Sequence, residues 1–343
     1  MTGKAETTAD FACEPGEAIL HAGLRAGIAL PYECASGTCG TCKATLVEGE
    51  TSCDWPEAPG HKTVKAERHE FLMCQTRAIS DVSIAIAKRV ADAAQTRVLP
   101  SLRGGILVDL ERLTHDVVSF SVVLDEPMDF AAGQFALFSV DDVRGARSYS
   151  MVNFDAGAQT LSFLVKRFPG GKLSDWLFDG TRDGTAVRLF GPLGSATFDP
   201  ALELDVCCLA GGSGIAGMMA MLEHARAIDY FARFRGNVVF GVRTCGDVFF
   251  LDELSAFVRS SHDNLRITIA ISNEIATAEL RERYPLLQFD TGFVHDVARP
   301  TCTSAAGSMF FVAGPPPMVD ASLRMLLLDA KAPGDRIRYD KFS

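Results

Sequence analysis

The chain has 343 residues, more than one hydrophobic core usually supports, so we expect two or three domains. Its formal net charge of -10 argues against a nucleic-acid partner, because phosphate binding depends on lysine and arginine. The sequence contains no signal-peptide pattern, and its longest weakly polar stretch, residues 206–222, is broken by glycines and short for a membrane span. We therefore expect a cytoplasmic protein with no membrane partner.

Ten cysteines in such a chain do not indicate a disulfide framework, which belongs to small oxidised domains. Their spacing is more informative than their number. Four of them form a recognisable pattern. We expect the remaining six to be buried apolar thiols: Cys13, Cys53, Cys207, Cys208, Cys245 and Cys302.

The patterned cysteines begin in the segment PYECASGTCGTCK, which starts at Pro31. Three follow the CxxxxCxxC spacing of plant-type 2Fe-2S proteins, and a fourth comes after a further loop: Cys34, Cys39, Cys42 and Cys74. Two irons need two pairs of thiolates, so a tight loop can supply three ligands while a distant residue completes the set. Gly37 and Gly40 would allow positive φ in that loop and bring N–H groups towards the sulfurs.

A structural zinc site is the alternative for these cysteines. Such sites usually have two short ligand pairs, and only Cys39 and Cys42 form one here. A Rieske centre would need two histidine ligands, but no histidine lies two residues from a cysteine of this loop. The spacing therefore favours a plant-type 2Fe-2S cluster over both.

The elements that follow change in character along the chain. Residues 79–87 alternate like a last strand, and residues 89–102 lack periodicity and predict a linker. Two β-rich runs within residues 105–124, and further runs at 135–140, 147–152 and 161–165, indicate a small antiparallel barrel or sandwich. Apolar strands then alternate with helical stretches, which predicts a parallel α/β layout: 206–210, 238–242, 267–271 and 310–313.

A first cofactor candidate lies in the segments RSYSMVNF, from Arg147, and LVKRFPGGKLSDWLF, from Leu164. Taken singly, Tyr149 could be core packing and Gly170 an ordinary turn residue. However, residues 171–174 lead into an expected helix over 173–178, whose N-terminus would present free N–H groups to an anion. Two interpretations of this segment therefore remain: it binds a phosphate, or its residues only pack in the core.

A second candidate is the strand over 206–210, which continues into GGSGIAG from Gly211 and a helical stretch over 215–227. A strand, glycine loop and helix can bind an anion through backbone N–H groups. The bare motif is weak, since a glycine turn can merely permit tight packing, and the full GxGxxG fingerprint is missing.

The order of cysteine loop, RxYS, GGKLS and nucleotide segment resembles the ferredoxin-NADP reductase superfamily over nearly the whole chain. Some stretches are similar, more narrowly, to reductase components of toluene monooxygenase and carbazole dioxygenase systems: DWPEAPG, GGSGIAG, AGPPPMVDA and YDKFS. The resemblance implies a multidomain α+β and α/β protein. Its expected parts are a β-grasp 2Fe-2S ferredoxin domain at 1–95, an antiparallel β-barrel FAD-binding domain at 103–200 and an α/β parallel-sheet NAD(P)H-binding domain at 204–343.

The same resemblance implies roles for residues of the flavin segment. Arg147 would contact the flavin pyrophosphate, Tyr149 would pack on the isoalloxazine, and Ser150 would lie near its reactive N5. The ribityl chain and phosphates would be held by a further set of residues: Lys166, Gly171, Lys172 and Ser174.

For the nucleotide, the resemblance implies binding by the loop Gly211, Gly212, Ser213 and Gly214 and by the turn Gly314 and Pro315. Arg243 would lie at the adenosine ribose, or else be a solvated strand-end residue. Asp247 follows it where a 2′-phosphate would want positive charge, so we expect NADH rather than NADPH. Phe342 would lie near the flavin face or serve as an apolar anchor. Two positions depart from the family pattern: Gly217 replaces a usual proline and Ala313 a usual cysteine.

A nicotinamide gives two electrons at once, whereas a 2Fe-2S cluster accepts one, so a flavin between them acts as the converter. The expected function is an NADH:acceptor oxidoreductase that supplies single electrons to an aromatic-ring oxygenase: a Rieske dioxygenase, its ferredoxin or a diiron monooxygenase. Ser150, Tyr149 and Phe342 are the residues expected at the reacting atoms. Two alternatives remain: a similar reductase serving deoxysugar synthesis, and a regulatory nucleotide-binding protein whose cysteines bind zinc.

Overall fold

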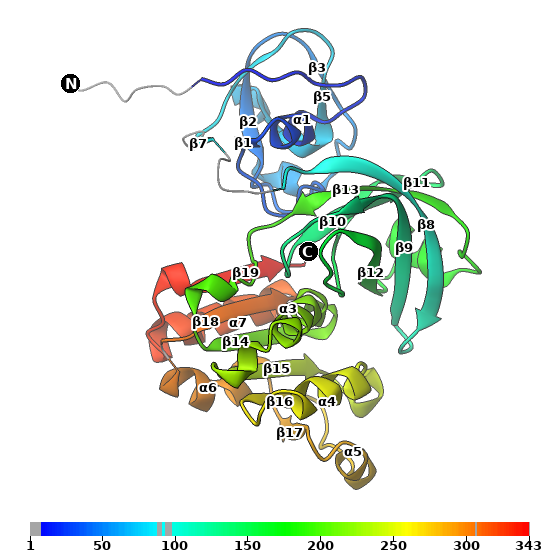
Figure 1. Ribbon diagram of the computed structural model, residues 1–343. Helices are drawn as coiled ribbons and strands as arrows, with labels where there is room; N and C mark the ends of the chain where they lie inside the picture. Colours follow the sequence, from blue (N-terminus) through cyan, green and yellow to red (C-terminus); the bar gives the residue numbers. More distant parts are fainter. Residues whose placement is uncertain (1–7, 88–90, 93–97, 306, 343) are drawn as a thin grey trace, which may run out of the picture. The chain divides into compact units, whose positions relative to one another are not determined.

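The computed structural model of the chain describes residues 8–87, 91–92, 98–305 and 307–342 (Figure 1). Its contacts divide the chain into two compact units. One consists of residues 1–104, 136–148 and 187–193, and the other of residues 105–135, 149–186 and 194–343. Among the described residues, no helix is both long and apolar enough to cross a membrane.

The first module runs from α1 to β7 and is drawn in blue and cyan in Figure 1. Its helix and strands are α1 (Ile19–Arg25), β1 (Ile28–Ala29), β2 (Lys43–Glu48), β3 (Thr51–Cys53), β4 (Glu70–Leu72), β5 (Thr76–Ala78), β6 (Ser83–Ala85) and β7 (Ala91–Asp92). Three strands form a sheet in the order β4-β2-β6, and β3 pairs with β5. The side chains of Ile19 and Leu20 in α1 are fully buried, which supplies the β-grasp core with its helix face.

Two predictions at the end of this module were too simple. The alternating stretch over 79–87 is a strand only at Ser83–Ala85, because Ile79 lies in a turn where its N–H donates to the carbonyl of Glu50. The predicted linker over 89–102 contains β7, which pairs antiparallel with β1, and it ends in the first residues of β8. Residues 89–90 and 93–97 of that stretch lie outside the described residues.

The second module runs from β8 to β13. Its elements are β8 (Ser101–Arg112), β9 (Val117–Met128), β10 (Phe135–Val140), β11 (Val143–Ser150), β12 (Ala158–Lys166), α2 (Lys172–Phe178) and β13 (Ala186–Leu193). The six strands follow the order β11-β10-β13-β8-β9-β12. An antiparallel bridge between Met151 and Phe163 joins the end of β11 to β12, so the sheet closes towards a barrel. The strand predicted at 147–152 ends at Ser150 and begins earlier, at Val143.

The third module runs from β14 to β19 and is a parallel sheet in the order β17-β16-β15-β14-β18-β19. Its elements are β14 (Val206–Gly211), α3 (Ile215–Ala227), β15 (Gly236–Val242), α4 (Leu251–Arg259), β16 (Leu265–Ile271), α5 (Ala278–Arg283), β17 (Gln288–Thr291), α6 (Val294–Ser304), β18 (Met309–Gly314), α7 (Pro316–Arg324) and β19 (Ile337–Lys341). The strand sequences are continuous apolar runs because helices cover both faces of the sheet. Residues of α3 and α4 pack in one core and residues of α6 and α7 in the other.

The six scattered cysteines are not all buried, so that prediction was wrong in part. Cys207, Cys208 and Cys302 are buried in the third module, and the Sγ atoms of Cys207 and Cys302 lie 3.4 Å apart. Cys53 is exposed because it lies on β3, a strand of a two-stranded ladder with an open face. Cys13 and Cys245 are partly exposed.

Candidate functional site

The four patterned cysteines come together in the first module. Cys34 and Cys39 lie in the loop between β1 and β2, Cys42 directly precedes β2, and Cys74 follows β4. The Sγ atoms of Cys42 and Cys74 are 3.2 Å apart, although 32 residues separate them in sequence. Their antiparallel strands explain this, since Lys43 on β2 is paired with Leu72 on β4. The prediction that a distant cysteine completes the set agrees with this geometry.

Backbone N–H groups point at the sulfurs of this loop. The Sγ of Cys34 accepts from the N–H groups of Ser36 and Cys39, with N···S distances of 3.5 and 3.4 Å, and the N–H of Thr41 donates to Cys39 Sγ at 3.4 Å. Hydrogen bonds from the Cys39 thiol, the Thr38 side chain and these N–H groups lower the pKa of Cys34 to about 4, against the opposing effect of burial. The hydrogen bond between the two side chains raises the pKa of the Cys39 thiol, so within this pair Cys34 is held as the thiolate, the form that binds iron.

Glycine is required at the two loop positions singled out in the sequence. Gly37 and Gly40 have φ values of 95° and 80°, which side chains rarely adopt. A Cβ on Gly40 would lie 2.5 Å from the Thr63 hydroxyl oxygen, and one on Gly37 would lie 3.0 Å from the Gln75 side chain. Four gathered thiols with N–H donors around them match the ligands of a 2Fe-2S cluster, so the residues fit that group.

Strand β11 connects the flavin segment to the cysteine loop. The hydroxyl of Ser148 donates to the carbonyl oxygen of Cys34 at 2.5 Å and lies 3.1 Å from the Ser36 hydroxyl. The guanidinium of Arg147 stacks over the ring of Trp55, 5.1 Å from its centroid. Cys34, a predicted cluster ligand, is therefore hydrogen-bonded to the residue that directly precedes Tyr149.

The same strand leads to the nucleotide loop through Ser150. Ser150 is buried, Tyr149 is half-buried, and a Cβ built on Gly217 in the first turn of α3 would lie 3.7 Å from Ser150 Cβ. Gly217 also faces the backbone of Gly133, which precedes β10. The residue expected near flavin N5 therefore lies against the helix that follows the glycine loop.

The turn after β12 has the predicted glycines and the predicted helix, which is α2. A Cβ on Gly171 would come within 2.9 Å of the Phe168 carbonyl oxygen, so only glycine fits. The hydroxyl of Ser174 bonds within the turn, accepting from the Phe168 N–H at 3.1 Å, while Lys172 is exposed. The first N–H groups of α2 have no partner inside the helix, which is compatible with an anion.

The glycine loop after β14 lies against the turn after β18. Gly212 has a φ of 53°, and a Cβ on Gly214 would lie 2.2 Å from the Ala313 carbonyl oxygen. Pro315 caps α7 beside this contact. The N–H of Phe342 donates to the Gly314 carbonyl at 2.9 Å, so the end of the chain is fixed at the same edge of the sheet. The two predicted nucleotide segments are thus neighbours.

Sequence reasoning missed several residues of these sites. Ser148 bonds β11 to the cysteine loop, and Trp55 stacks on Arg147 of the same strand. Asp116 pairs with Arg243, and His115 lies beside Asp116; of these three residues the sequence predicted only Arg243. The alternation of side chains along β11 could have indicated Ser148, because its neighbours carry the expected flavin roles. No local signal marks Asp116, whose cationic partners Lys166 and Arg243 are 50 and 127 residues away in sequence.

Comparisons with known proteins agree with this architecture. The chain matches the 2Fe-2S iron-sulfur cluster binding domain over residues 4–78, the oxidoreductase FAD-binding domain over 105–198 and the oxidoreductase NAD-binding domain over 208–323. Iron–sulfur flavoprotein oxidoreductases are therefore the class that the fold and the sites define. The zinc-binding alternative for the cysteines is excluded by the first of these matches.

The ferredoxin–NAD(P)+ reductase CarAd of Metapseudomonas resinovorans is 34% identical, with 99% of this chain and 98% of the relative covered. The xylene/toluene monooxygenase electron transfer component XylA of Pseudomonas putida is 30% identical, with 91% and 85% covered. A solved ferredoxin reductase in carbazole 1,9a-dioxygenase superposes with a TM-score of 0.82 at 33% identity, with 96% and 94% covered. The chain belongs to the family of ferredoxin–NAD(P)+ reductases, and the predicted resemblance is confirmed.

Proposed function

We propose that the chain is an NADH-dependent reductase that delivers single electrons to an aromatic-ring oxygenase. The acceptor would be a Rieske dioxygenase, its ferredoxin or a diiron monooxygenase. The observation that carries this proposal is the similarity over nearly the whole chain to reductases named for carbazole and for xylene/toluene systems. We place the protein in the cytoplasm, because ten cysteines in a chain of this size do not indicate a disulfide framework.

When bound, FAD supplies the conversion between two-electron transfer from a nicotinamide and single-electron transfer through a 2Fe-2S cluster. The side chains need no acid, base or nucleophile, and their task is placement. Arg147 and the turn after β12 would bind flavin phosphates, Tyr149 would cover the ring and Ser150 would face its reactive edge. The residues proposed for the ribityl chain and phosphates are Lys166, Gly171, Lys172 and Ser174.

The nucleotide would bind at the carboxyl edge of the parallel sheet, as ligands do in open α/β sheets. The proposed contacts are Gly211, Gly212, Ser213, Gly214, Arg243, Gly314 and Pro315. Phe342 would lie where the nicotinamide enters. The pairing of Arg243 with carboxylates supports NADH over NADPH. We propose domain boundaries at 1–95, 103–200 and 204–343, within which the three matched ranges fall.

The first experiment is an anaerobic visible spectrum of the purified protein before and after addition of NADH. Overlapping flavin and iron–sulfur absorption should bleach with NADH, and cytochrome c should then be reduced as a one-electron acceptor. A protein that stays colourless after reconstitution with iron, sulfide and FAD would contradict the proposal. Bleaching of the flavin without cytochrome c reduction would contradict the single-electron output.

Replacing Tyr149 by alanine should weaken FAD retention about fivefold, because a half-buried aromatic packed on a flat ring contributes roughly 1 kcal/mol. The dissociation constant can be measured by titrating deflavinated protein with FAD and following the quenching of flavin fluorescence. Tyr339→Ala is the control, since Tyr339 is an exposed tyrosine of β19. Unchanged FAD affinity in the Tyr149 variant would refute the assignment.

A further inference from the structure

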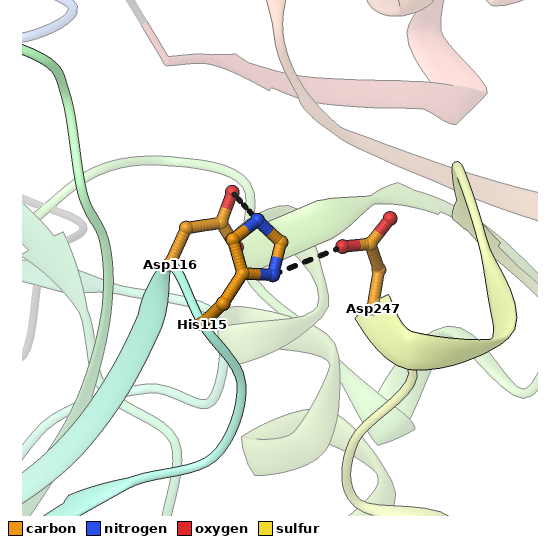
Figure 2. Close-up of side chains that lie close together, drawn as sticks. All are labelled: His115, Asp116 and Asp247. Carbon is orange, nitrogen blue, oxygen red and sulfur yellow. Dashed lines mark ion pairs between the residues drawn. The ribbon is translucent and has the colours of Figure 1, made fainter.

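Four charged side chains and the ring of His115, from three segments, meet beside the nucleotide loop. The carboxylate of Asp116, in the turn between β8 and β9, lies 2.9 Å from Lys166 Nζ and 3.4 Å from an Arg243 guanidinium nitrogen. Asp247 is 3.9 Å from Arg243, and the His115 ring lies 3.6 Å from the carboxylate of Asp116 and 3.6 Å from that of Asp247. Figure 2 shows the His115 ring between the two aspartate side chains. Two cations from the second and third modules therefore converge on one carboxylate of the second module.

Asp116 remains ionised in this setting. Its side chain is 15% exposed, and although burial opposes ionisation, the hydrogen bond and charge of Lys166 hold the carboxyl pKa below its usual value. The ligand atoms of His115, Asp116 and Asp247 lie within 4.8 Å of one another, a spacing compatible with a metal ion. Lys166 and Arg243 already balance these two carboxylates, so the arrangement needs no metal.

The cluster lies where the pyridine nucleotide is expected. Lys166 Cδ is 4.0 Å from a Cβ built on Gly212, the second residue of the glycine loop. Arg243 directly follows β15, the second strand of the unit β14–loop–α3–β15. In such units the residues at the end of the second strand distinguish a ribose 2′-hydroxyl from a 2′-phosphate. Arg243 would be the cation for a 2′-phosphate, but carboxylates flank it on two sides.

We propose that Asp116 is a specificity-determining residue that disfavours 2′-phosphorylated nucleotides, although it belongs to the second module and not to the NAD-binding module. This inference rests on the proposed use of NADH. A 2′-phosphate carries up to two negative charges at neutral pH and would compete with Asp116 for Arg243. A 2′-hydroxyl adds no charge and leaves the ion pairs intact.

Asp116→Asn tests this inference in the holoenzyme. Isothermal titration calorimetry with NAD+ and NADP+, which bind without turnover, gives the ratio of the two dissociation constants. Removal of one nearby negative charge should lower the ratio of the NADP+ to the NAD+ constant about fivefold, and the effect should shrink in high salt. Asp116→Glu should retain the wild-type ratio because it retains the charge.

Glu203→Gln is the matched control, since Glu203 forms an exposed ion pair with Arg233 far along the chain from these residues. If Asp116→Asn yields no holoenzyme, the same titrations are made with His115→Lys. A cation at this exposed position neutralises the carboxylates of Asp116 and Asp247. An unchanged ratio, or equal changes for both nucleotides, overturns the inference in either variant. A wild-type preference for NADP+ would refute the proposed use of NADH, while the change in ratio would still report the role of Asp116.

Discussion

Replacing Cys74 by serine should abolish the 2Fe-2S cluster while leaving NADH-dependent bleaching of the flavin largely intact. Cys74 is buried beside Cys42 and supplies the fourth thiol, which no neighbouring cysteine can replace because Cys53 is the nearest other in sequence and is exposed. Oxygen from serine is a poor substitute for a thiolate with iron–sulfur clusters. Iron and sulfide content, with anaerobic spectra before and after NADH, would measure both effects.

Cys53→Ser is the control, since it removes a thiol from the same module without touching the four ligands. It should retain full iron content and cytochrome c reduction. If Cys74→Ser also lost flavin reduction while keeping its fold, the modules would not be functionally independent. The contact of Ser148 with Cys34 makes this a real alternative, because a collapsed cysteine loop could disturb β11.

The elements with strong local patterns were predictable from the sequence. The prediction for 215–227 coincides with α3, and the four parallel strands were placed within two residues, because continuous apolar runs between glycines leave little choice. Strand β11 was misplaced because the stretch VRGARSYS is polar, and only pairing in the sheet makes it a strand. Tertiary pairing there overrides weak local preference.

The gathering of the four cysteines was predictable because iron–sulfur chemistry imposes a spacing that the sequence displays directly. The network around Asp116 was not, since Asp116, Lys166 and Arg243 are brought together by strand order and by the packing of two modules. Short polar residues in turns usually serve the turn itself, and Asp116 does so through its contact with Thr114. Only the fold reveals its second role.

Gly214→Ala should lower the affinity for NAD+ by about tenfold or more and destabilise the fold by about 1–3 kcal/mol. Gly214 has an ordinary right-handed helical conformation, so alanine is not strained there and would otherwise be favoured. The cost comes from its Cβ, which would lie 2.2 Å from the Ala313 carbonyl oxygen and force the loop away from β18. Calorimetric titration with NAD+ and thermal unfolding of the holoenzyme would measure the two effects.

Gly217→Ala is a matched change three residues further along the same segment. A Cβ there would meet Gly133 at 3.4 Å and Ser150 at 3.7 Å, which are ordinary contact distances. Alanine inside α3 should therefore be neutral or stabilising by up to about 1 kcal/mol, with NAD+ affinity within about threefold of the wild type. Equal loss of affinity in both variants would mean that the loop tolerates no added atom. The close approach of Gly214 to β18 would then not be what sets nucleotide binding.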